Sequence, residues 1–237
     1  GAISLQAGET VTCTFNDQKD AFIIVDKVTD PAGDLTIFDF DTDYDSGDID
    51  LADATTPNNS GDLDPGLYSV AENVPAGWDL TSATCDDGSP VGAISLQAGE
   101  TVTCTFTNQA DAFIIVEKQT DPDGDPTVFD FDLSYGSGDA DLSDGQTDNS
   151  GDLAPGLYSV AENVPAGWDL TSATCDDGSP VGAISLQAGE TVTCTFSNQA
   201  DANIVVVKQT DPDGDPTSFE FDPSYASNFF LTDGNSN

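Results

Sequence analysis

The stretch GLYSVAENVPAGWDLTSATCDDGSPVGAISLQAGE at residues 66–100 decides the architecture, because it recurs without a change at residues 156–190. The shorter string GAISLQAGETVTCTF occurs three times, at residues 1–15, 92–106 and 182–196. Self-similarity at a fixed period indicates tandem copies of one folded unit. The sequence therefore predicts an array of similar small domains rather than one large domain.

Apolar runs that follow a short polar joint set the boundaries of the repeat. They are AFIIV at residues 21–25, AFIIV at 112–116 and ANIVVV at 202–207. With this phase, residues 21–110 and 111–200 are two complete β-sandwich repeats. Residues 1–20 are then the C-terminal strand of a truncated preceding repeat, and residues 201–237 are the N-terminal part of a truncated following repeat. We expect either an excerpt of a longer array or half-repeats that neighbouring chains complete.

Within a repeat, short β-rich segments alternate with turn-forming clusters such as DPDGD and DDGSP. In the second repeat we expect strands near residues 112–119, 127–133, 156–162, 167–175 and 190–198. No window has the apolar period of an amphipathic helix. Several short strands in about 90 residues are typical of an Ig-like antiparallel β-sandwich, so the predicted fold class is all-β.

Acidic residues dominate the charge of the chain, with 44 Asp and Glu against four Lys, no His and a formal net charge of −40. Regular apolar runs argue against disorder and indicate folded domains with an acidic, solvated surface. Such a surface repels nucleic acid, whose phosphates are bound by Lys and Arg. No apolar stretch approaches the ~20 residues of a membrane span. The chain is therefore predicted neither to bind nucleic acid nor to insert into a membrane.

The cysteines follow the repeat. Cys85 and Cys104 lie in one complete repeat, and Cys175 and Cys194 keep the same spacing in the next. We predict a disulfide within each pair, which places the protein in an oxidising, extracellular compartment. The alternative is free buried thiols or metal ligands, and the lack of His disfavours a zinc site. Cys13 matches Cys104, and its partner would precede residue 1.

Three of the four lysines occupy one position of the repeat, just after the apolar run: Lys27, Lys118 and Lys208. Strand alternation places Lys27 on the same face as Ile23 and Val25, which is a buried face. A lone ammonium on a core face is costly unless it is paired or chemically altered. On other strands, some polar residues lie an even number of positions from apolar core residues and so share their inward face. They are Glu72 and Asn108 in the first repeat, and Glu162 and Asn198 in the second. Each complete repeat is therefore expected to aim one Lys, one Glu and one Asn inward.

The order of IIVEK at residues 114–118, GLYSVAENVPAGW at 156–168 and CTFSN at 194–198 resembles a known family. It is similar to the collagen-adhesin B-type repeat of bacterial surface adhesins and pilins, the prealbumin-like or SpaA-type domain. The resemblance implies a prealbumin-like sandwich in which a first-strand Lys and a last-strand Asn form a spontaneous isopeptide bond with the help of a Glu. The implied sets are Lys27, Asn108 and Glu72 in the first repeat, and Lys118, Asn198 and Glu162 in the second.

The same residues allow a second interpretation, a buried Lys–Glu pair that is hydrogen-bonded to Asn with no covalent bond. Asp17 stands where the other copies have Asn108 and Asn198. An aspartate there would form the amide with loss of water, or would form no bond in that unit.

Acidic turns provide the candidate metal ligands of this chain. They are Asp121, Asp123 and Asp125 in one DPDGD turn, and Asp211, Asp213 and Asp215 in the next. Alternating carboxylates around a Gly turn suit calcium, which takes six to eight oxygen ligands. The alternative is an ordinary solvated turn. Calcium is therefore the one cofactor that the sequence suggests, and no other is expected.

Near-identical units without His or Arg offer no unique catalytic site, so we expect no enzyme activity. The predicted function is structural, as a component of an extracellular stalk, fibre or surface filament at the cell surface. Its predicted partners are neighbouring repeats or further copies of the chain. Two alternatives remain open. One is an adhesin that binds a host or matrix ligand through the repeats, and the other is a rod made rigid by calcium.

Overall fold

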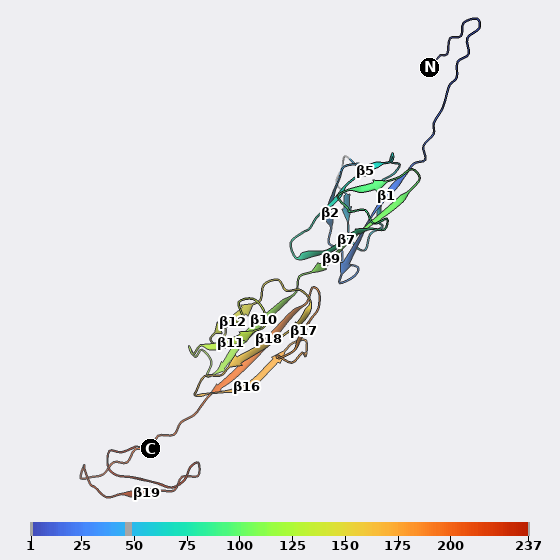
Figure 1. The fold of residues 1–237 in the computed structure, drawn as a ribbon. Helices are drawn as coiled ribbons and strands as arrows, with labels where there is room; N and C mark the ends of the chain where they lie inside the picture. The colour runs from blue at the N-terminus through green and yellow to red at the C-terminus, as the bar shows by residue number, and fades with distance from the viewer. Residues whose placement is uncertain (1, 46–48, 237) are drawn as a thin grey trace.

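The computed structural model of the chain describes residues 2–45 and 49–236. Residues 1, 46–48 and 237 lie outside the described part, so the outermost residue of each predicted terminal segment, 1–20 and 201–237, is not covered. Figure 1 shows two β-sandwich units in succession along the chain. The named secondary-structure elements of the described residues are all β-strands. None of these residues forms a helix that is long and apolar enough to cross a membrane. The predicted all-β fold class is confirmed.

The first unit contains two facing layers of strands. Its strands are β1 (Phe22–Asp30), β2 (Phe38–Thr42), β3 (Ile49–Leu51), β4 (Asn58–Asn59), β5 (Gly66–Tyr68), β6 (Val70–Asn73), β7 (Trp78–Cys85), β8 (Ile94–Leu96) and β9 (Thr101–Ala110). One sheet has the order β4-β1-β9-β7, and the opposing layer contains the sheet β3-β2-β6 and the pair β5-β8. The first and last long strands, β1 and β9, are parallel neighbours.

The second unit repeats this topology. Its strands are β10 (Phe113–Asp121), β11 (Phe129–Leu133), β12 (Asp139–Leu142), β13 (Thr147–Asn149), β14 (Gly156–Tyr158), β15 (Val160–Asn163), β16 (Trp168–Cys175), β17 (Ile184–Leu186) and β18 (Thr191–Ala200). The sheets are β13-β10-β18-β16, β12-β11-β15 and β14-β17. Here β10 and β18 are the parallel neighbours.

One predicted strand is divided in the structure. The segment expected as a single strand at residues 156–162 forms β14 and β15, which pair with different partners. The break falls at Ser159, whose N–H donates to the Ser134 hydroxyl at 2.8 Å and whose carbonyl accepts from the Ser134 N–H at 3.0 Å. Both backbone groups of Ser159 are thus used at the end of β11, and this moves the chain from one sheet pairing to the other.

The two segments that flank the complete units are less regular. Residues 2–20 contain no strand, and Cys13 is an exposed free thiol. Residues 201–236 contain the hairpin of β19 (Phe219–Phe221) and β20 (Phe229–Leu231) and an isolated bridge between Val207 and Ser236. The completely folded part of the described chain is therefore the pair of units.

Alternation along the long strands builds each core. In β1 the residues from Ile23 to Thr29 are buried at every second position, and β9 buries Val102, Cys104, Phe106 and Asn108 in the same way. Trp78 closes one end of the core against Phe38, with an edge-to-face contact of 5.3 Å between ring centroids. The inward faces of the two parallel strands therefore supply both the apolar core and two of its buried polar side chains.

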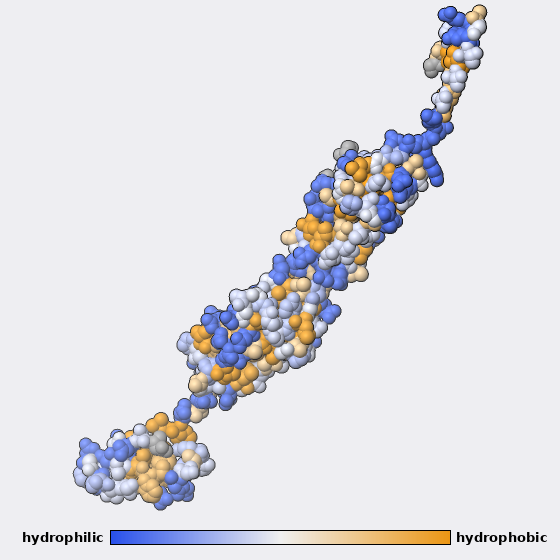
Figure 2. Space-filling model, viewed as in Figure 1, coloured by the Kyte–Doolittle hydropathy of each residue, from blue (hydrophilic) through white to orange (hydrophobic). Residues whose placement is uncertain are grey.

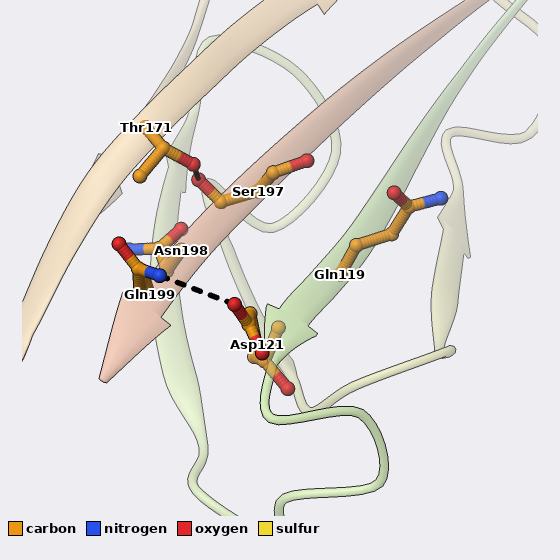
Figure 3. Close-up of a pocket in the computed structure, with 7 residues that line it drawn as sticks. Gln119, Asp121, Thr171, Ser197, Asn198 and Gln199 are labelled. Carbon is orange, nitrogen blue, oxygen red and sulfur yellow. Dashed lines mark hydrogen bonds between the residues drawn. The ribbon is translucent and has the colours of Figure 1, made fainter.

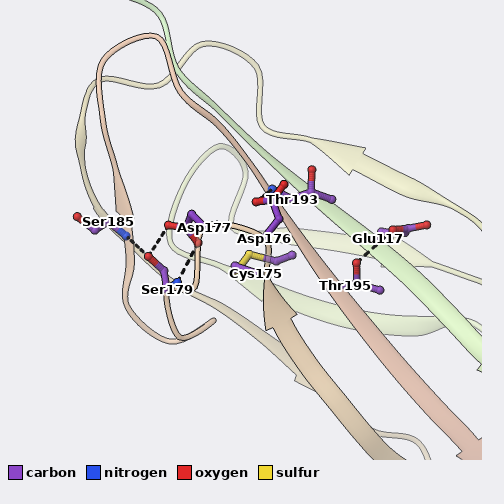
Figure 4. Close-up of a disulfide and its surroundings, with 9 residues drawn as sticks. Glu117, Cys175, Asp176, Asp177, Ser179, Ser185, Thr193 and Thr195 are labelled. Atoms are coloured by element: carbon purple, nitrogen blue, oxygen red, sulfur yellow. Dashed lines mark hydrogen bonds between the residues drawn. A yellow bond between two sulfur atoms is a disulfide. The ribbon is translucent and has the colours of Figure 1, made fainter. Parts of the chain in front are cut away.

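Both predicted disulfides are present. Cys85 lies directly opposite Cys104 in the β7–β9 pair, and Cys175 lies opposite Cys194 in the β16–β18 pair. Figure 4 shows the disulfide of the second unit at the end of β16, beside the Asp176–Ser179 turn. In each unit the bond joins the edge strand to the last strand.

Removal of this bond is expected to weaken the unit that contains it. The Cys175→Ala, Cys194→Ala variant should lower the free energy of unfolding of the second unit by about 3 kcal/mol, because the unfolded chain regains the entropy of the opened loop. Denaturant unfolding followed by Trp168 fluorescence in a Trp78→Phe background measures the change. The Cys85→Ala, Cys104→Ala change in the same background is the control, because it should leave the unfolding of the second unit unchanged. An unchanged unfolding midpoint for the second unit would contradict the expectation.

Carboxylates face one another across the outer strands. Asp39 lies opposite Asp50 in the β2–β3 pair, and Asp130 lies opposite Asp141 in the β11–β12 pair. Like charges that are directly opposite destabilise a strand pair. Figure 2 shows hydrophilic residues over much of the visible surface of both units. With a net charge of −40, we therefore expect the chain to be more stable at high ionic strength.

The Asp141→Asn variant tests this repulsion. At low salt it should raise the free energy of unfolding of the second unit by about 0.5 kcal/mol, because one member of the Asp130–Asp141 pair becomes neutral. The gain should shrink in ~1 M salt, where the screening length is about 3 Å. Denaturant unfolding at the two salt concentrations measures it. A gain that is equal at both would show that charge repulsion is not its source.

Candidate crosslinking site

Three strands bring one Lys, one Glu and one Asn together in each complete unit. In the first unit β1 supplies Lys27, β6 supplies Glu72 and β9 supplies Asn108. Lys27 follows Ile23 and Val25 on the inward face of β1 and is only 3% exposed, and Asn108 is fully buried. The side chain of Glu72 is also fully buried. The polar residues whose parity points inward thus meet inside the sandwich.

The lysine amine lies against the amide of the asparagine. Lys27 Nζ donates to Asn108 Oδ1 at 2.8 Å and to the Val28 carbonyl at 2.8 Å. Glu72 Oε1 lies 3.6 Å from the same nitrogen. Contact between the first and last strands is possible because β1 and β9 are adjacent, with Lys27 paired to Phe106 and Thr29 paired to Asn108.

The second unit reproduces this geometry. Lys118 Nζ donates to Asn198 Oδ1 at 2.8 Å and lies 3.5 Å from Glu162 Oε1. Both charged side chains are fully buried in the ion pair. Because the two units differ in sequence around the lysine, the agreement of these distances indicates that the arrangement belongs to the repeat.

An aromatic ring forms the floor of each lysine site. Lys27 Nζ lies 4.0 Å from the centroid of the Phe38 ring, and Lys118 Nζ lies 4.1 Å from that of Phe129. Both rings are fully buried. Phe38 and Phe129 are not among the residues expected from the sequence, although both stand at the start of a repeated FDFD motif that could have indicated them. The ring supplies apolar surroundings for the amine and limits the space around it.

Burial alters the protonation of the site. Burial lowers the pKa of the Lys27 amine, and the negative charge of Glu72 opposes this effect. Burial also raises the pKa of the Glu72 carboxyl, against the opposing charge of Lys27. The pKa of Lys118 is lowered by burial in the same way. In the first unit both shifts act toward the neutral amine and the neutral acid.

Several polar atoms of the site have no hydrogen-bond partner in the described chain. They are both carboxylate oxygens of Glu72 and of Glu162, and the Nδ2 atoms of Asn108 and Asn198. Buried polar atoms are normally satisfied, so a repeated set of exceptions calls for an explanation. The same atoms lack partners in both units, so the exceptions belong to the repeat.

The third lysine of the series has only part of the site. Lys208 Nζ lies 4.2 Å from the Phe219 ring centroid and donates to the Gln209 carbonyl. In the described residues it makes no hydrogen bond or ion pair with a Glu or Asn side chain. Asp17, at the position of Asn108 in the repeat, is exposed in a segment without strands. The structure therefore completes the site in two units only.

The acidic turns do not gather their carboxylates. Asp121 Oδ2 accepts from the Gln199 side chain at 3.1 Å, and Asp125 Oδ1 accepts from the Thr127 N–H at 2.9 Å. Asp215 repeats the second contact with Thr217 at 2.7 Å. No group of three or more His, Cys, Asp or Glu side chains in the described residues is arranged to hold a metal ion. The structure thus does not bring the suggested calcium ligands, Asp121, Asp123, Asp125, Asp211, Asp213 and Asp215, together.

A small polar pocket lies beside the site of the second unit. It has a volume of about 280 Å³ and is lined by Gln119, Thr120, Asp121, Thr171, Ser197, Asn198 and Gln199. Figure 3 shows these side chains around the ends of β10, β16 and β18, with the Gln199–Asp121 hydrogen bond across one side. Asn198 is one of the lining residues of the pocket, although it is only 1% exposed.

Comparison with known proteins gives one family and several solved structures. The model of a prealbumin-like fold domain matches residues 23–110 and 114–200. No curated protein matches. The Bacillus anthracis TIE protein is 17% identical with a TM-score of 0.36, over 92% of this chain and 42% of that one. The chain thus spans less than half of that protein.

Two further solved structures are similar to the chain. The major pilin T-13 of Streptococcus pyogenes is 13% identical with a TM-score of 0.33, over 78% of this chain and 97% of that one. A C-terminal fragment of the pilus adhesin SpaC of Lactobacillus rhamnosus GG is 17% identical with a TM-score of 0.28, over 78% and 99%.

Proposed function

Because this chain belongs to the prealbumin-like fold domain family, whose model covers both complete units, we propose that it is a structural part of an extracellular filament, stalk or fibre. Each unit acts as one bead of the filament and closes itself with a Lys–Asn isopeptide bond. Near-identical beads suit this role, because the length of the array is the property that repetition supplies.

One observation carries the proposal. In both units a buried lysine amine lies 2.8 Å from the amide oxygen of an asparagine on the last strand, with a buried glutamate 3.5–3.6 Å away. A reactive pair that joins the first and last strands of a domain closes that domain covalently. The same atoms offer no room for an external substrate, because all three side chains are buried.

The contacts of Lys27 and the directions of the pKa shifts together support one route to the bond. A neutral Lys27 amine attacks Cγ of Asn108, while protonated Glu72 donates a hydrogen bond to Oδ1 and polarises the carbonyl. The new Nζ–Cγ bond replaces the Cγ–Nδ2 bond. One amine proton passes through the Glu72 carboxyl to Nδ2, which leaves as ammonia. Glu72 ends in its starting form, so the step is a single maturation event without oxidant or cofactor.

The compartment and the partners belong to the same proposal. Two disulfides persist only in an oxidising environment, which supports a position outside the cell. In the polypeptide the units follow one another through the short joint Asp111–Ala112, between the end of β9 and the start of β10. Neighbouring beads of the array are therefore the first partners of each unit.

Intact mass of the full chain tests the proposed bonds. Under reducing conditions the mass should fall short of the sequence mass by two molecules of ammonia, one for each complete unit. Without reduction the deficit should grow by the four hydrogens of the two disulfides. A reduced mass equal to the sequence mass would reject the isopeptide bonds and leave an ion pair held by hydrogen bonds.

A further inference from the structure

We infer that the disulfide Cys85–Cys104 is a positioning device, which fixes the register of β9 so that Asn108 stops beside Lys27. Cys175–Cys194 does the same for Asn198 and Lys118. The inference rests on the proposed crosslink and assigns a role to residues outside the reacting set. It follows from the strand order, the sequence of β9 and the place of the disulfide.

No tight turn sets the register of β9. Its pairing with β1 is parallel, and residues 31–100 lie between the two strands. Its other neighbour, β7, is antiparallel, but the connection through residues 86–100 passes through β8 in the opposing layer. Register in a hairpin is fixed by the turn, and this strand has no hairpin partner. The register of β9 must therefore come from its side chains.

The alternation of buried and exposed residues along β9 does not by itself distinguish between registers that differ by two residues. A slip of one residue is excluded, because it would turn Val102 and Phe106 out of the core. A slip of two keeps every residue on its own face. On the outer face it exchanges one threonine for the next among Thr101, Thr103, Thr105 and Thr107. On the inner face it moves the buried Phe106 ring from its contact with Phe40, where the ring centroids are 5.0 Å apart, so core packing opposes the slip as well. Such a slip moves Asn108 by about 6–7 Å, which is beyond reach of the lysine amine.

The disulfide permits one register only. Cys85 and Cys104 are directly opposite, with 4.0 Å between their Cα atoms. After a slip of two residues the same atoms would be about 8 Å apart, beyond the ~7 Å that a disulfide spans. The bond therefore selects the register in which Thr29 is paired with Asn108.

β7, the strand to which the disulfide ties β9, has contacts of its own that hold its start. At the start of β7, Trp78 packs edge-to-face on Phe38 of the opposing sheet at 5.3 Å. Thr81 Oγ1 donates to the Thr107 carbonyl at 3.0 Å, beside a bulge in the β7–β9 pairing between Leu80 and Ser82. Trp78 thus holds the start of β7 on the core, and Cys85, the buried residue at the other end of the strand, ties β7 to β9 through the disulfide.

The cysteines act at a distance from the chemistry. Cys104 and Asn108 share the inward face of β9 and are four residues apart, or about 13 Å along the strand. Cys85 and Cys104 are therefore positioning residues. Because the second unit carries the same set, each unit is a control for the other within one molecule.

The first test removes the disulfide from one unit. The full chain with Cys85→Ala and Cys104→Ala is produced afresh, and the fraction of each unit that is crosslinked is followed over time by peptide mass mapping. The Lys27–Asn108 bond should form roughly a hundredfold more slowly than Lys118–Asn198, because misplaced groups lose their near-attack geometry. A Trp168→Phe background leaves Trp78 to report that the first unit is folded.

The second test moves the disulfide by two residues. The Val102→Cys, Cys104→Val variant keeps the composition of β9 but can bridge to Cys85 only in the slipped register. With this disulfide formed, as checked by non-reducing mass, the Lys27–Asn108 bond should be absent. A disulfide that merely stabilises the fold would leave the bond intact.

The outcomes separate this inference from the proposed function. Equal crosslinking rates in both units of the Cys85→Ala, Cys104→Ala chain, or a normal Lys27–Asn108 bond beside the shifted disulfide, would overturn the register role and leave the crosslink in place. Absence of both crosslinks from the unaltered chain would overturn the crosslink and the inference together.

Discussion

Replacement of Lys118 by Met is expected to remove one of the two ammonia losses and to lower the free energy of unfolding of the second unit by about 4–5 kcal/mol. The proposed bond between Lys118 and Asn198 would close a loop over a separation of 80 residues, which is now spanned by a hydrogen bond. A covalent closure of that size restricts the unfolded chain by roughly this amount in the chain-entropy description. Intact mass and denaturant unfolding followed by Trp168 in a Trp78→Phe background measure the two effects.

Lys208 gives the matched control for this variant. It occupies the same position of the repeat and lies 4.2 Å from the ring centroid of Phe219, but in the described residues it forms no hydrogen bond or ion pair with a Glu or Asn side chain. The Lys208→Met chain should keep both ammonia losses and the stability of the second unit. A Lys118→Met chain that still lacked two molecules of ammonia would show that Lys118 is not the nucleophile.

Replacement of Glu72 by Gln should trap the first unit without its crosslink. The Glu72 carboxyl is buried 3.6 Å from Lys27 Nζ, and burial raises its pKa toward the protonated form that the reaction needs. Glutamine keeps the shape but cannot pass a proton to the leaving nitrogen. Loss of a general acid and base slows a reaction by roughly 10²–10⁴-fold. Peptide mass mapping of newly folded chain should show a free Lys27 beside a complete Lys118–Asn198 bond.

An exposed glutamate controls for the change of charge. Glu220 lies on the surface of β19, and the Glu220→Gln chain should crosslink both units at the normal rate. If the Glu72→Gln chain formed its first crosslink as fast as its second, the carboxyl would have no role in the proton transfer. The unit would then react through the proximity of amine and amide alone.

The candidate site could be predicted from the sequence because strand parity is a local property. Alternation in AFIIVDK places Lys27 with the core residues of its strand, and the same count places Asn108 with Phe106. Three polar side chains that point into one small apolar core are expected to pair with one another, because the core offers few other polar partners. The structure brings each predicted Lys, Glu and Asn together within hydrogen-bonding or ion-pair distance.

Contacts that depend on how distant strands pack could not be predicted from the alternation of residues along single strands. Phe38 is a core residue by its pattern, but only the packing of one sheet on the other places its ring 4.0 Å from the Lys27 amine. The division at Ser159 depends on hydrogen bonds between the Ser159 backbone and Ser134. The sequence of residues 156–162 alone does not predict these bonds. Loop carboxylates such as Asp121 and Asp125 are satisfied by neighbours whose position is set by the fold.

The parallel arrangement of β1 and β9 determines how a unit responds to pulling. The chain enters at Phe22, at one end of the strand pair, and leaves at Ala110, at the other end. Tension on the two ends therefore loads all the hydrogen bonds between these strands in shear, so that they must break together and not one after another. With the Lys27–Asn108 bond in place, force passes directly from β1 to β9, and residues 28–107 remain a hidden length that tension cannot extend.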